Sequence, residues 1–466
     1  MKSAEVQSLV EKVLARMSKG EAPGAEMPAN PRGVFKSVDE AVAAAKIGQQ
    51  LLVEIPLDKR REIIANIRRR AAEDVHNLSK MAHEETGLGR VADKVKKNLL
   101  AIHRTPGVEI LTPTAWTGDG GLTLMERAPY GIIGSITPCT NPTETILCNT
   151  IGMIAGGNAV VFNTHPAAKQ ISAYCIDLIN RASMEVGGPE NLACCVAHPT
   201  IESAGQLMHH PGIRLLVVTG GGGVVKAAMN SGKKAICAGP GNPPVVVDET
   251  ADIGQAGRGI VAGASFDNNV ICTDEKEVFV VEKVANQLLD VMRNSGAVQI
   301  RNHQIRRLEK LILTPDGEHV NRDWVGKDAS EYLRAIDVPF KGDPRLVIAE
   351  VPFEHPFVQH ELLMPVIGVV RVPDVHAAID LAIEAEHGYR HTASMYSKNL
   401  DALHRMARAV DCSIFIKNAP NYAGLGYGGE GFTSFTIASP TGEGLTSARD
   451  FTRVRRCTLA GYFRIT

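Results

Sequence analysis

Short apolar runs that alternate with helical patterns constrain the fold of this chain most strongly. The runs 131–138, 159–164, 190–197 and 213–220 have the length and apolar character of strands that are buried on both faces. Helical patterns lie between them, so the order is strand, helix, strand, helix. This repetition predicts a doubly wound α/β domain with a mostly parallel sheet.

The same alternation continues on both sides of these runs. Amphipathic patterns predict helices at 37–53, 58–85 and near 167–186. A second α/β segment runs from about 243 to 430, with strands predicted at 243–248 and 277–282. The chain of 466 residues is long enough for two to three domains, which agrees with two such segments.

Charge, hydropathy and cysteine usage exclude several classes of protein. Lys and Arg number 50 and Asp and Glu 51, so bulk charge offers no attraction to nucleic acid or to an anionic membrane. No apolar run reaches the roughly 20 residues of a membrane-spanning helix. Nine scattered cysteines without a secretory signal indicate cytoplasmic thiols, and no His, Cys or Asp spacing predicts a metal site.

Residues 1–17 form a separate amphipathic unit, because Val6, Val10 and Val13 lie on one helical stripe. Residues 18–33 hold three prolines and three glycines and are typical of a flexible linker. The helix can dock on its own domain, or it can be a short tag that lies in a groove of another protein. The long linker favours the tag.

Two glycine-rich segments are candidates for a phosphate site. Gly426, Gly428 and Gly431 have the spacing of a dinucleotide fingerprint, but they follow a loop and do not open a βαβ unit, so we reject them. In 217–228 a predicted strand leads through four glycines into a helix, whose first N–H groups can face a phosphate. The alternative is a glycine-rich turn that binds nothing.

Cys272 is the cysteine with the most reactive setting. It follows the polar, turn-prone residues Asp267, Asn268 and Asn269, where a thiol can be exposed and nearby N–H groups can lower its pKa. The alternative is that Cys272, like most single cysteines, is a small buried apolar residue.

From about residue 34 to its end, the chain resembles the aldehyde dehydrogenase superfamily, and within it the CoA-acylating branch of ethanolamine and propanediol utilisation operons. The motifs that carry this resemblance are TPCTNPTET (137–145), GNAVVFNTHPAAK (157–169), VVTGGGGVV (217–225), AGPGNPPVVVDETAD (238–252), GASFDNNVIC (263–272), ELLMPV (361–366), IFIKNAP (414–420), GGEGFTSFTIASPTGEG (428–444) and TSARDFTRVRRC (446–457).

The resemblance implies an aldehyde dehydrogenase-like α/β fold. It implies a Rossmann-type domain for NAD and CoA from residues 34–111 and 132–240, and an α/β catalytic domain over 241–435. Residues 112–131 and 436–466 would form a β arm that joins subunits into a dimer or tetramer. Residues 1–17 look like the encapsulation tails of this branch, which implies a shell-protein partner and a location in the lumen of a bacterial microcompartment.

The resemblance assigns the roles of the family's site residues to the matching positions of this sequence. Cys272 matches the family's nucleophile, Asn141 its oxyanion-binding asparagine and Glu361 the glutamate that holds the nicotinamide ribose. The segments that resemble cofactor-binding ones contain Thr137, Pro138, His165, Pro166, Gly220 and Gly221.

One departure from the wider superfamily concerns the second half of the reaction. Hydrolytic members carry a glutamate that activates water in the segment matched here by 238–242, which has no carboxylate. Loss of a general base costs about 10²–10⁴ in rate, whereas a thiol such as CoA needs less help. The resemblance therefore implies oxidation of a short aldehyde, acetaldehyde before propionaldehyde, to acyl-CoA. The alternatives are a hydrolytic dehydrogenase that gives the free acid, a CoA-dependent acyltransferase without redox chemistry, and an interaction protein of the microcompartment.

For each of the weaker candidate residues, a functional role and a purely structural role both remain open. His391 is either a residue of the acyl pocket or a satisfied core histidine. Lys226, Lys233 and Lys234 contact CoA phosphates or form a solvated helix face, and we favour the solvated face. Cys139 is close to Asn141 in sequence, and packing is its favoured role.

Overall fold

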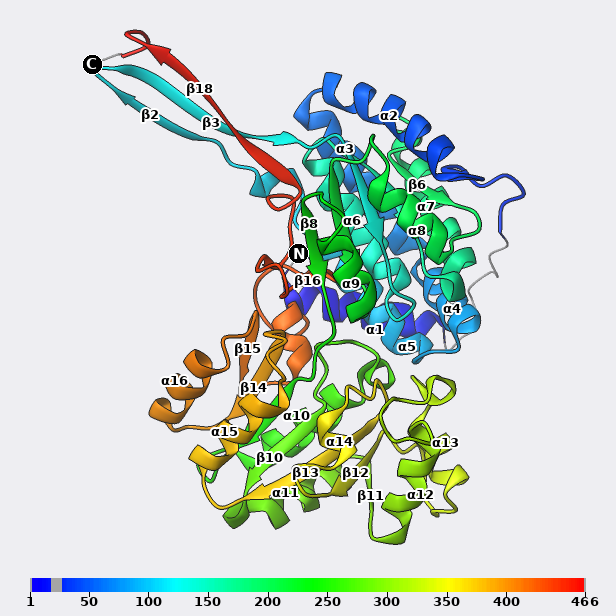
Figure 1. Ribbon diagram of the computed structural model, residues 1–466, viewed down its shortest axis with the longest axis vertical. Coiled ribbons are helices and arrows are strands. Elements are labelled where there is room, and N and C mark those ends of the chain that lie inside the picture. The colour runs from blue at the N-terminus through cyan, green and yellow to red at the C-terminus, as the bar shows by residue number, and fades with distance from the viewer. Residues whose placement is uncertain (1, 18–26, 465–466) are drawn as a thin grey trace.

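The computed structural model describes residues 2–17 and 27–464. Figure 1 shows two α/β lobes, one above the other, and a narrow antiparallel arm that projects from the upper lobe. Within the described residues, no helix combines the length and the apolar character needed to cross a membrane.

The first lobe holds a six-stranded sheet in which all strands are parallel, in the order β1-β6-β5-β4-β7-β8. Its strands are β1 (Val34–Phe35), β4 (Ile132–Ile136), β5 (Ala159–Asn163), β6 (Ala193–Val196), β7 (Leu215–Thr219) and β8 (Ala235–Ala238). Its helices are α2 (Val38–Glu54), α3 (Leu57–Glu73), α4 (Val75–Thr86), α5 (Val91–Arg104), α6 (Pro142–Ala155), α7 (Lys169–Glu185), α8 (Ile201–His209) and α9 (Gly222–Met229).

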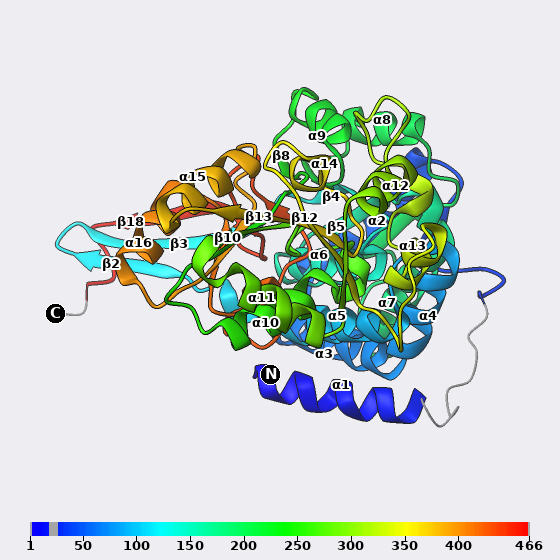
Figure 2. The same ribbon diagram turned by 90° about the horizontal axis from the view of Figure 1, so that it is seen from below.

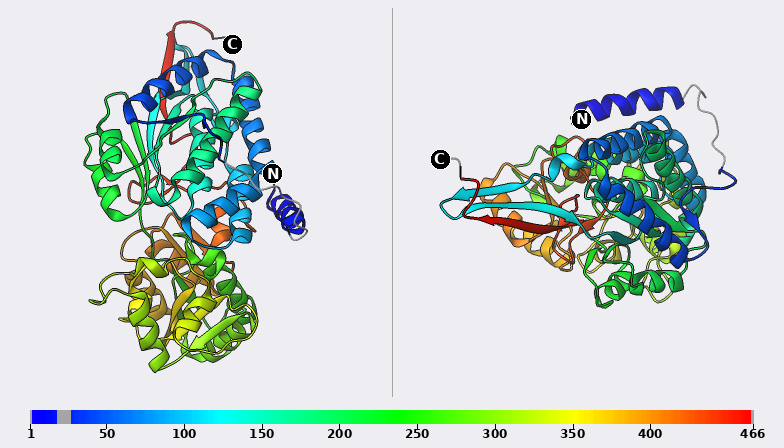
Figure 3. Two further views of the ribbon diagram at one scale, coloured as in Figure 1. Left: turned by 90° about the vertical axis from the view of Figure 1, so that its right-hand side faces the viewer. Right: turned by 90° about the horizontal axis from the view of Figure 1, so that it is seen from above.

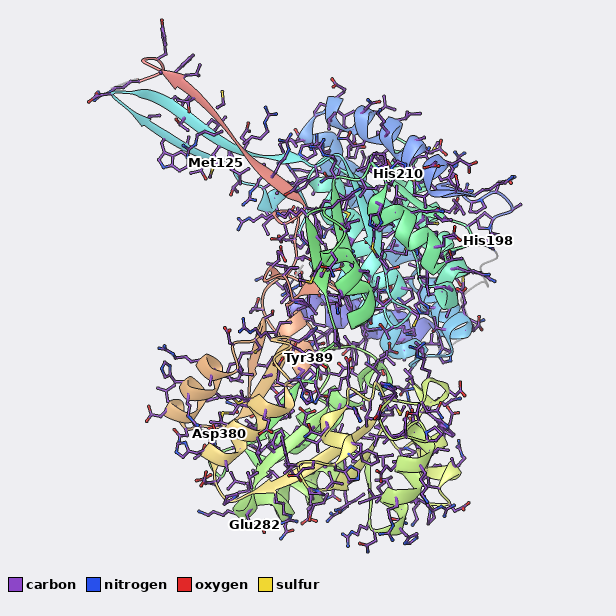
Figure 4. The ribbon with its side chains drawn as sticks, in the orientation of Figure 1. Met125, His198, His210, Glu282, Asp380 and Tyr389 are labelled. Atoms are coloured by element: carbon purple, nitrogen blue, oxygen red, sulfur yellow. The ribbon has the colours of Figure 1, made fainter. Side chains whose placement is uncertain are left out.

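The second lobe holds a seven-stranded parallel sheet in the order β11-β12-β13-β10-β9-β14-β15. Its strands are β9 (Pro244–Val247), β10 (Glu277–Val281), β11 (Ala297–Ile300), β12 (Leu346–Glu350), β13 (Val366–Val372), β14 (Thr392–Tyr396) and β15 (Ile414–Lys417). Its helices are α10 (Ile253–Ala264), α11 (Glu282–Asn294), α12 (His303–Ile312), α13 (Ala329–Ala335), α14 (Pro356–Gln359), α15 (Val375–Ala385) and α16 (Leu400–Ala409). In Figure 4, Glu282 and Asp380 mark this lobe, His198 and His210 mark the first, and Tyr389 lies near their junction.

The predicted α/β architecture is confirmed, with one error in the helices. The span 58–85 is two helices, α3 and α4, because Asp74 leaves helical geometry at φ −102° and ψ 10°. The Asp74 carboxylate accepts hydrogen bonds from Asn77 Nδ2 and from the Tyr174 hydroxyl, both at 2.7 Å. These two bonds hold the Asp74 side chain at the break between α3 and α4.

The arm is a three-stranded antiparallel sheet of β2 (Thr114–Gly118), β3 (Gly121–Pro129) and β18 (Thr452–Ala460). Its free end extends beyond both lobes in Figure 1 and in the right-hand view of Figure 3, and Met125 marks it in Figure 4. Of the predicted arm segment 436–466, only β18 pairs with β2 and β3. The short strands β16 (Ile437–Ala438) and β17 (Gly444–Leu445) form their own sheet in the body, where Phe451 is buried.

Helix α1 (Ser3–Met17) docks on the chain's own body. It lies along α5 (Figure 2), with Val6 and Val10 only 1% and 3% exposed. Near its start, the Ser3 hydroxyl accepts a hydrogen bond of 2.8 Å from the Gly428 backbone N–H. The structure thus shows the docked helix, whereas the sequence favoured a free tag. Of the predicted linker at 18–33, residues 18–26 lie outside the described residues.

Candidate active site

A cavity of about 690 Å³ opens at the carboxyl ends of the first lobe's strands. The chain leaves β4 toward β5 and leaves β7 toward β8, in opposite directions, and parallel sheets bind ligands at this kind of switch point. The second lobe closes the other side. All nine predicted site residues line this cavity: Thr137, Pro138, Asn141, His165, Pro166, Gly220, Gly221, Cys272 and Glu361.

A strained turn presents Cys272 to the cavity. Asp267, Asn268 and Asn269 all have left-handed backbones, with φ of 45°, 56° and 65°. Asp and Asn tolerate this region better than other residues with side chains. The Asn269 amide holds the turn by donating to the carbonyls of Ala264 and Glu275, both at 2.8 Å.

Lys276 stabilises the turn through hydrogen bonds to Asn269 and Ile271. Its buried ammonium donates to the Asn269 carbonyl at 2.9 Å, to Asn269 Oδ1 at 2.6 Å and to the Ile271 carbonyl at 3.1 Å. The positive charge also lowers the pKa values of Cys272 and Glu361, against the effect of burial. Lys276 was not predicted as a site residue, although it lies only four residues after Cys272 in the sequence.

The Cys272 thiol is protonated in the free protein at neutral pH. Burial, followed by the charge of Glu361, raises the pKa of Cys272 to about 12. A backbone N–H at the turn does lower the pKa, as the sequence predicted, but burial outweighs it. Burial also raises the pKa of Glu361 to about 7, although Lys276 and the Gly241 backbone N–H oppose it.

Asn141 sits at the start of α6, and the loop after β4 places it there. Its side chain is buried, with Oδ1 accepting a hydrogen bond of 2.7 Å from Lys97 Nζ. Its Nδ2 donates to Thr140 Oγ1 at 3.1 Å. Asn141 and Cys272 both line this cavity.

The remaining wall fits an adenine nucleotide. Gly221 precedes α9, and an added Cβ there would meet no atom within 4 Å, so a phosphate can approach the first N–H groups of the helix. Ile201 is 94% exposed yet lines the cavity, and it offers an apolar surface to a base. The rejected glycines Gly426, Gly428 and Gly431 follow a 3₁₀ turn and precede no helix.

Arg322 is a site residue that the sequence analysis missed. Among the residues that line the cavity in the described chain, it is the only lysine or arginine. It begins a 3₁₀ turn, Arg322–Trp324, of the second lobe. Burial lowers the pKa of His165, and the charge of Arg322 lowers it further. No local motif marks such an arginine, because only the tertiary fold brings it to the site.

His391 does not line the cavity, and as a core residue it has a ring nitrogen without a hydrogen-bond partner among the described residues. It is fully buried, its Nδ1 pairs with Thr392 Oγ1 at 2.8 Å, and its Nε2 has no partner among the described residues. Burial, helped by Lys276, lowers the pKa of His391 to about 4, so the ring is neutral. An added Cβ at Gly241 would meet His391 Cγ at 2.9 Å and the Cys272 carbonyl at 3.0 Å.

The other weak candidates differ in whether they line the cavity. Cys139 packs against the core of the first lobe, as favoured, and it also lines the cavity. Lys233 donates to the Ile213 carbonyl at 3.0 Å, and Lys234 donates to the Tyr130 hydroxyl at 3.1 Å. Both lie between α9 and β8, outside the residues that line the cavity, so the predicted solvated helix face is wrong for them; Lys226, on α9, is exposed as predicted.

The cavity lining holds few acidic groups. Residues 238–242 contain no carboxylate, and Glu361 is the one acidic residue that lines the cavity in the described chain. Within that same part of the chain, no group of three His, Cys, Asp or Glu side chains could hold a metal ion.

Comparison with known proteins agrees with this geometry. The family model "Aldehyde dehydrogenase family" matches residues 22–306. The Escherichia coli K12 protein "Acetaldehyde dehydrogenase (acetylating) EutE" is 49% identical over the full length of both chains.

Two solved structures share the fold. A propionaldehyde dehydrogenase from the fucose utilisation microcompartment of Clostridium phytofermentans is 48% identical, with a TM-score of 0.92 over 93% of this chain and 100% of that one. The Rhodopseudomonas palustris propionaldehyde dehydrogenase, solved with bound CoA and an acylated cysteine, is 48% identical, with a TM-score of 0.90 over 92% and 98%. This chain belongs to the aldehyde dehydrogenase family.

Proposed function

We propose that this protein is an NAD-dependent, CoA-acylating dehydrogenase of short aldehydes, with acetaldehyde favoured and propionaldehyde next. One observation carries the proposal: Cys272, Asn141 and the nucleotide-facing segments line a single cavity that has no carboxylate at 238–242. The cavity thus provides a nucleophile and a nucleotide site, and it has no carboxylate at the position where hydrolytic members carry the glutamate that activates water.

Cys272 begins the reaction. Its thiol loses a proton and its sulfur adds to the aldehyde carbonyl, which gives a thiohemiacetal. The Asn141 amide and the Cys272 backbone N–H donate hydrogen bonds to the developing oxyanion. Bound NAD supplies the acceptor for the hydride that leaves the former carbonyl carbon, and an acyl thioester remains on Cys272.

CoA completes the reaction by transthioesterification. Its thiol is a strong nucleophile that needs less base catalysis than water does. Attack on the acyl carbon releases Cys272 and preserves the energy of the thioester. The balanced change is aldehyde, NAD⁺ and CoA to acyl-CoA, NADH and a proton.

NAD and CoA share chemistry that suits this cavity. Both carry adenine and a pyrophosphate, and the cavity offers Ile201, the glycines Gly220 and Gly221, His165 and Arg322. Glu361 holds the nicotinamide ribose in this proposal. Since one cavity serves both, NADH leaves before CoA enters, and the kinetics are ping-pong.

A single assay tests the proposal. Purified protein receives acetaldehyde and NAD, with CoA present or omitted, and NADH is followed by absorbance. We expect NADH formation that requires CoA and is abolished in Cys272→Ala. NADH formation that is indifferent to CoA indicates the hydrolytic alternative. Initial-rate plots that intersect, where parallel lines are expected, contradict the ping-pong order.

The arm joins subunits in this proposal. Trp116, Val454 and Leu459 are large apolar side chains exposed on a sheet only three strands wide. Such a surface favours association with another copy, which supports a homodimer or tetramer. Light scattering of Trp116→Arg against the unaltered protein tests this, and an unchanged molar mass contradicts it.

Helix α1 is the proposed contact with a microcompartment shell protein, and the lumen is the proposed location. The apolar stripe that contains Val6 and Val10 can pack in a groove of a partner as it packs on α5. The C. phytofermentans relative from a microcompartment supports this assignment.

A further inference from the structure

Two buried lysines of α5 reach from the first lobe toward the turn that carries Cys272. Lys94 and Lys97 lie one helical turn apart, and both side chains are fully buried. Both donate to Asp267 Oδ2, at 3.0 Å and 2.6 Å respectively. Lys97 also donates to Asn141 Oδ1 at 2.7 Å.

The contact with Lys97 fixes which way the Asn141 amide faces. An ammonium group only donates hydrogen bonds, so it holds Oδ1 and leaves Nδ2 on the opposite side of the amide. There Nδ2 donates to Thr140 Oγ1, and both residues line the cavity. Without Lys97, the amide could rotate and present an oxygen to the oxyanion, which would repel it.

Lys97 remains charged in its buried position. Burial lowers the pKa of Lys97, but the charges of Asp267 and Glu144 outweigh burial and hold it above its usual value. Glu144 Oε1 lies 3.4 Å from Lys97 Nζ. A cation on Oδ1 also polarises the amide, which makes its N–H groups stronger donors.

We infer that Lys97 is a positioning residue, which orients the Asn141 amide so that Nδ2 meets the oxyanion and which ties Asn141 to the turn of Cys272 through Asp267. This inference rests on the proposed role of Asn141. Lys97 itself does not line the cavity, so it acts through Asn141.

Lys94 provides a matched control, because it shares the helix, the burial and the contact with Asp267. We expect Lys97→Met to lower kcat for CoA-dependent NADH formation about tenfold or more, since a single oxyanion donor contributes about 10²–10³. The KM for NAD stays within about twofold, because Lys97 lies outside the cavity. The fold loss of kcat in Lys94→Met should be at least five times smaller than the fold loss in Lys97→Met. Equal losses of kcat in the two variants contradict the inference.

A second pair of variants preserves the charge balance in case single changes unfold the protein. Lys97→Met/Glu144→Gln and Lys94→Met/Glu144→Gln have equal net charge, and Lys97 is absent from only the first. The same difference in kcat is expected between them. Far-ultraviolet circular dichroism and thermal melting establish that both are folded.

A double-mutant cycle separates the inference from the proposed function. In an Asn141→Ala background, Lys97→Met should cost less than about twofold, because the residue through which it acts is gone. If both single changes lower kcat and their effects multiply, Lys97 has a structural role alone and the inference fails. If Asn141→Ala leaves kcat unchanged, the proposed role of Asn141 fails first.

Discussion

The carboxylate of Glu361 and the thiol of Cys272 face the same cavity, and the negative charge of Glu361 raises the pKa of Cys272. A nicotinamide ribose bound by Glu361 would therefore lie beside the nucleophile. Because burial raises the pKa of Glu361 to about 7, this acid changes charge close to neutrality. Its protonation state thus influences how readily Cys272 forms a thiolate.

Glu361→Gln should make Cys272 more reactive in the free protein. A nearby negative charge disfavours the thiolate, so its removal lowers the pKa of Cys272 and moves the thiolate titration to lower pH. We expect alkylation by iodoacetamide at pH 8 to be at least threefold faster than in the unaltered protein. Mass spectrometry of the peptide that contains Cys272 measures the rate for this thiol alone. An unchanged or slower rate would refute the electrostatic coupling.

Arg322→Ala should weaken binding of both nucleotides. Loss of the only lysine or arginine that lines the cavity removes a charge-assisted contact to phosphate, so Kd for NAD and for CoA should rise about tenfold. Calorimetric titration measures both constants, and the difference should shrink at high salt. Lys226→Ala, an exposed lysine on α9 outside the cavity, is the control. Equal effects of the two changes would show that general surface charge is responsible.

Deletion of residues 1–19 should leave the specific activity intact and abolish binding to the shell protein. Because Val6 and Val10 are buried on α5, we also expect the free energy of unfolding to fall by about 1–3 kcal/mol. Co-sedimentation with shell protein and chemical unfolding measure the two effects. Ser3→Ala, which keeps the apolar stripe, should still co-sediment. Loss of activity on deletion would indicate that α1 is an integral part of the enzyme.

The left-handed turn before Cys272 should reveal its strain in a pair of variants. Asn269→Gly and Asn269→Ala both lose the amide bonds to Ala264 and Glu275, but glycine adopts a φ of 65° without cost. The alanine variant should therefore be less stable than the glycine variant by about 1 kcal/mol. Urea unfolding at pH 7 measures the difference. Equal stabilities would mean that the turn relaxes.

The sequence predicted the strands well because buried parallel strands are continuous apolar runs. The run 159–164, for example, is β5 in the structure, and its end places His165 at the cavity. The nine candidate site residues came from motifs with family-wide spacing, and the fold gathers all of them.

The parts that the sequence did not predict depend on contacts between distant segments. Lys97 precedes Asn141 by 44 residues, and in sequence it is one more basic residue of an amphipathic helix. Arg322 likewise stands in a loop without a motif. Tyr174, which donates a hydrogen bond to Asp74 at the break between α3 and α4, lies 100 residues away. Local patterns cannot report such partners, so a helix that looks continuous in sequence is divided in the fold.

The Asp267 carboxylate has a mechanical consequence for ligand exchange. It belongs to the turn of the nucleophile, yet Lys94, Lys97 and the Arg90 backbone N–H of the first lobe all bind it. These buried bonds connect the two lobes beside Cys272. Separation of the lobes at this point would expose the buried charges of Asp267, Lys94 and Lys97. The proposed exchange of NADH for CoA therefore proceeds without separation of the two lobes at this point.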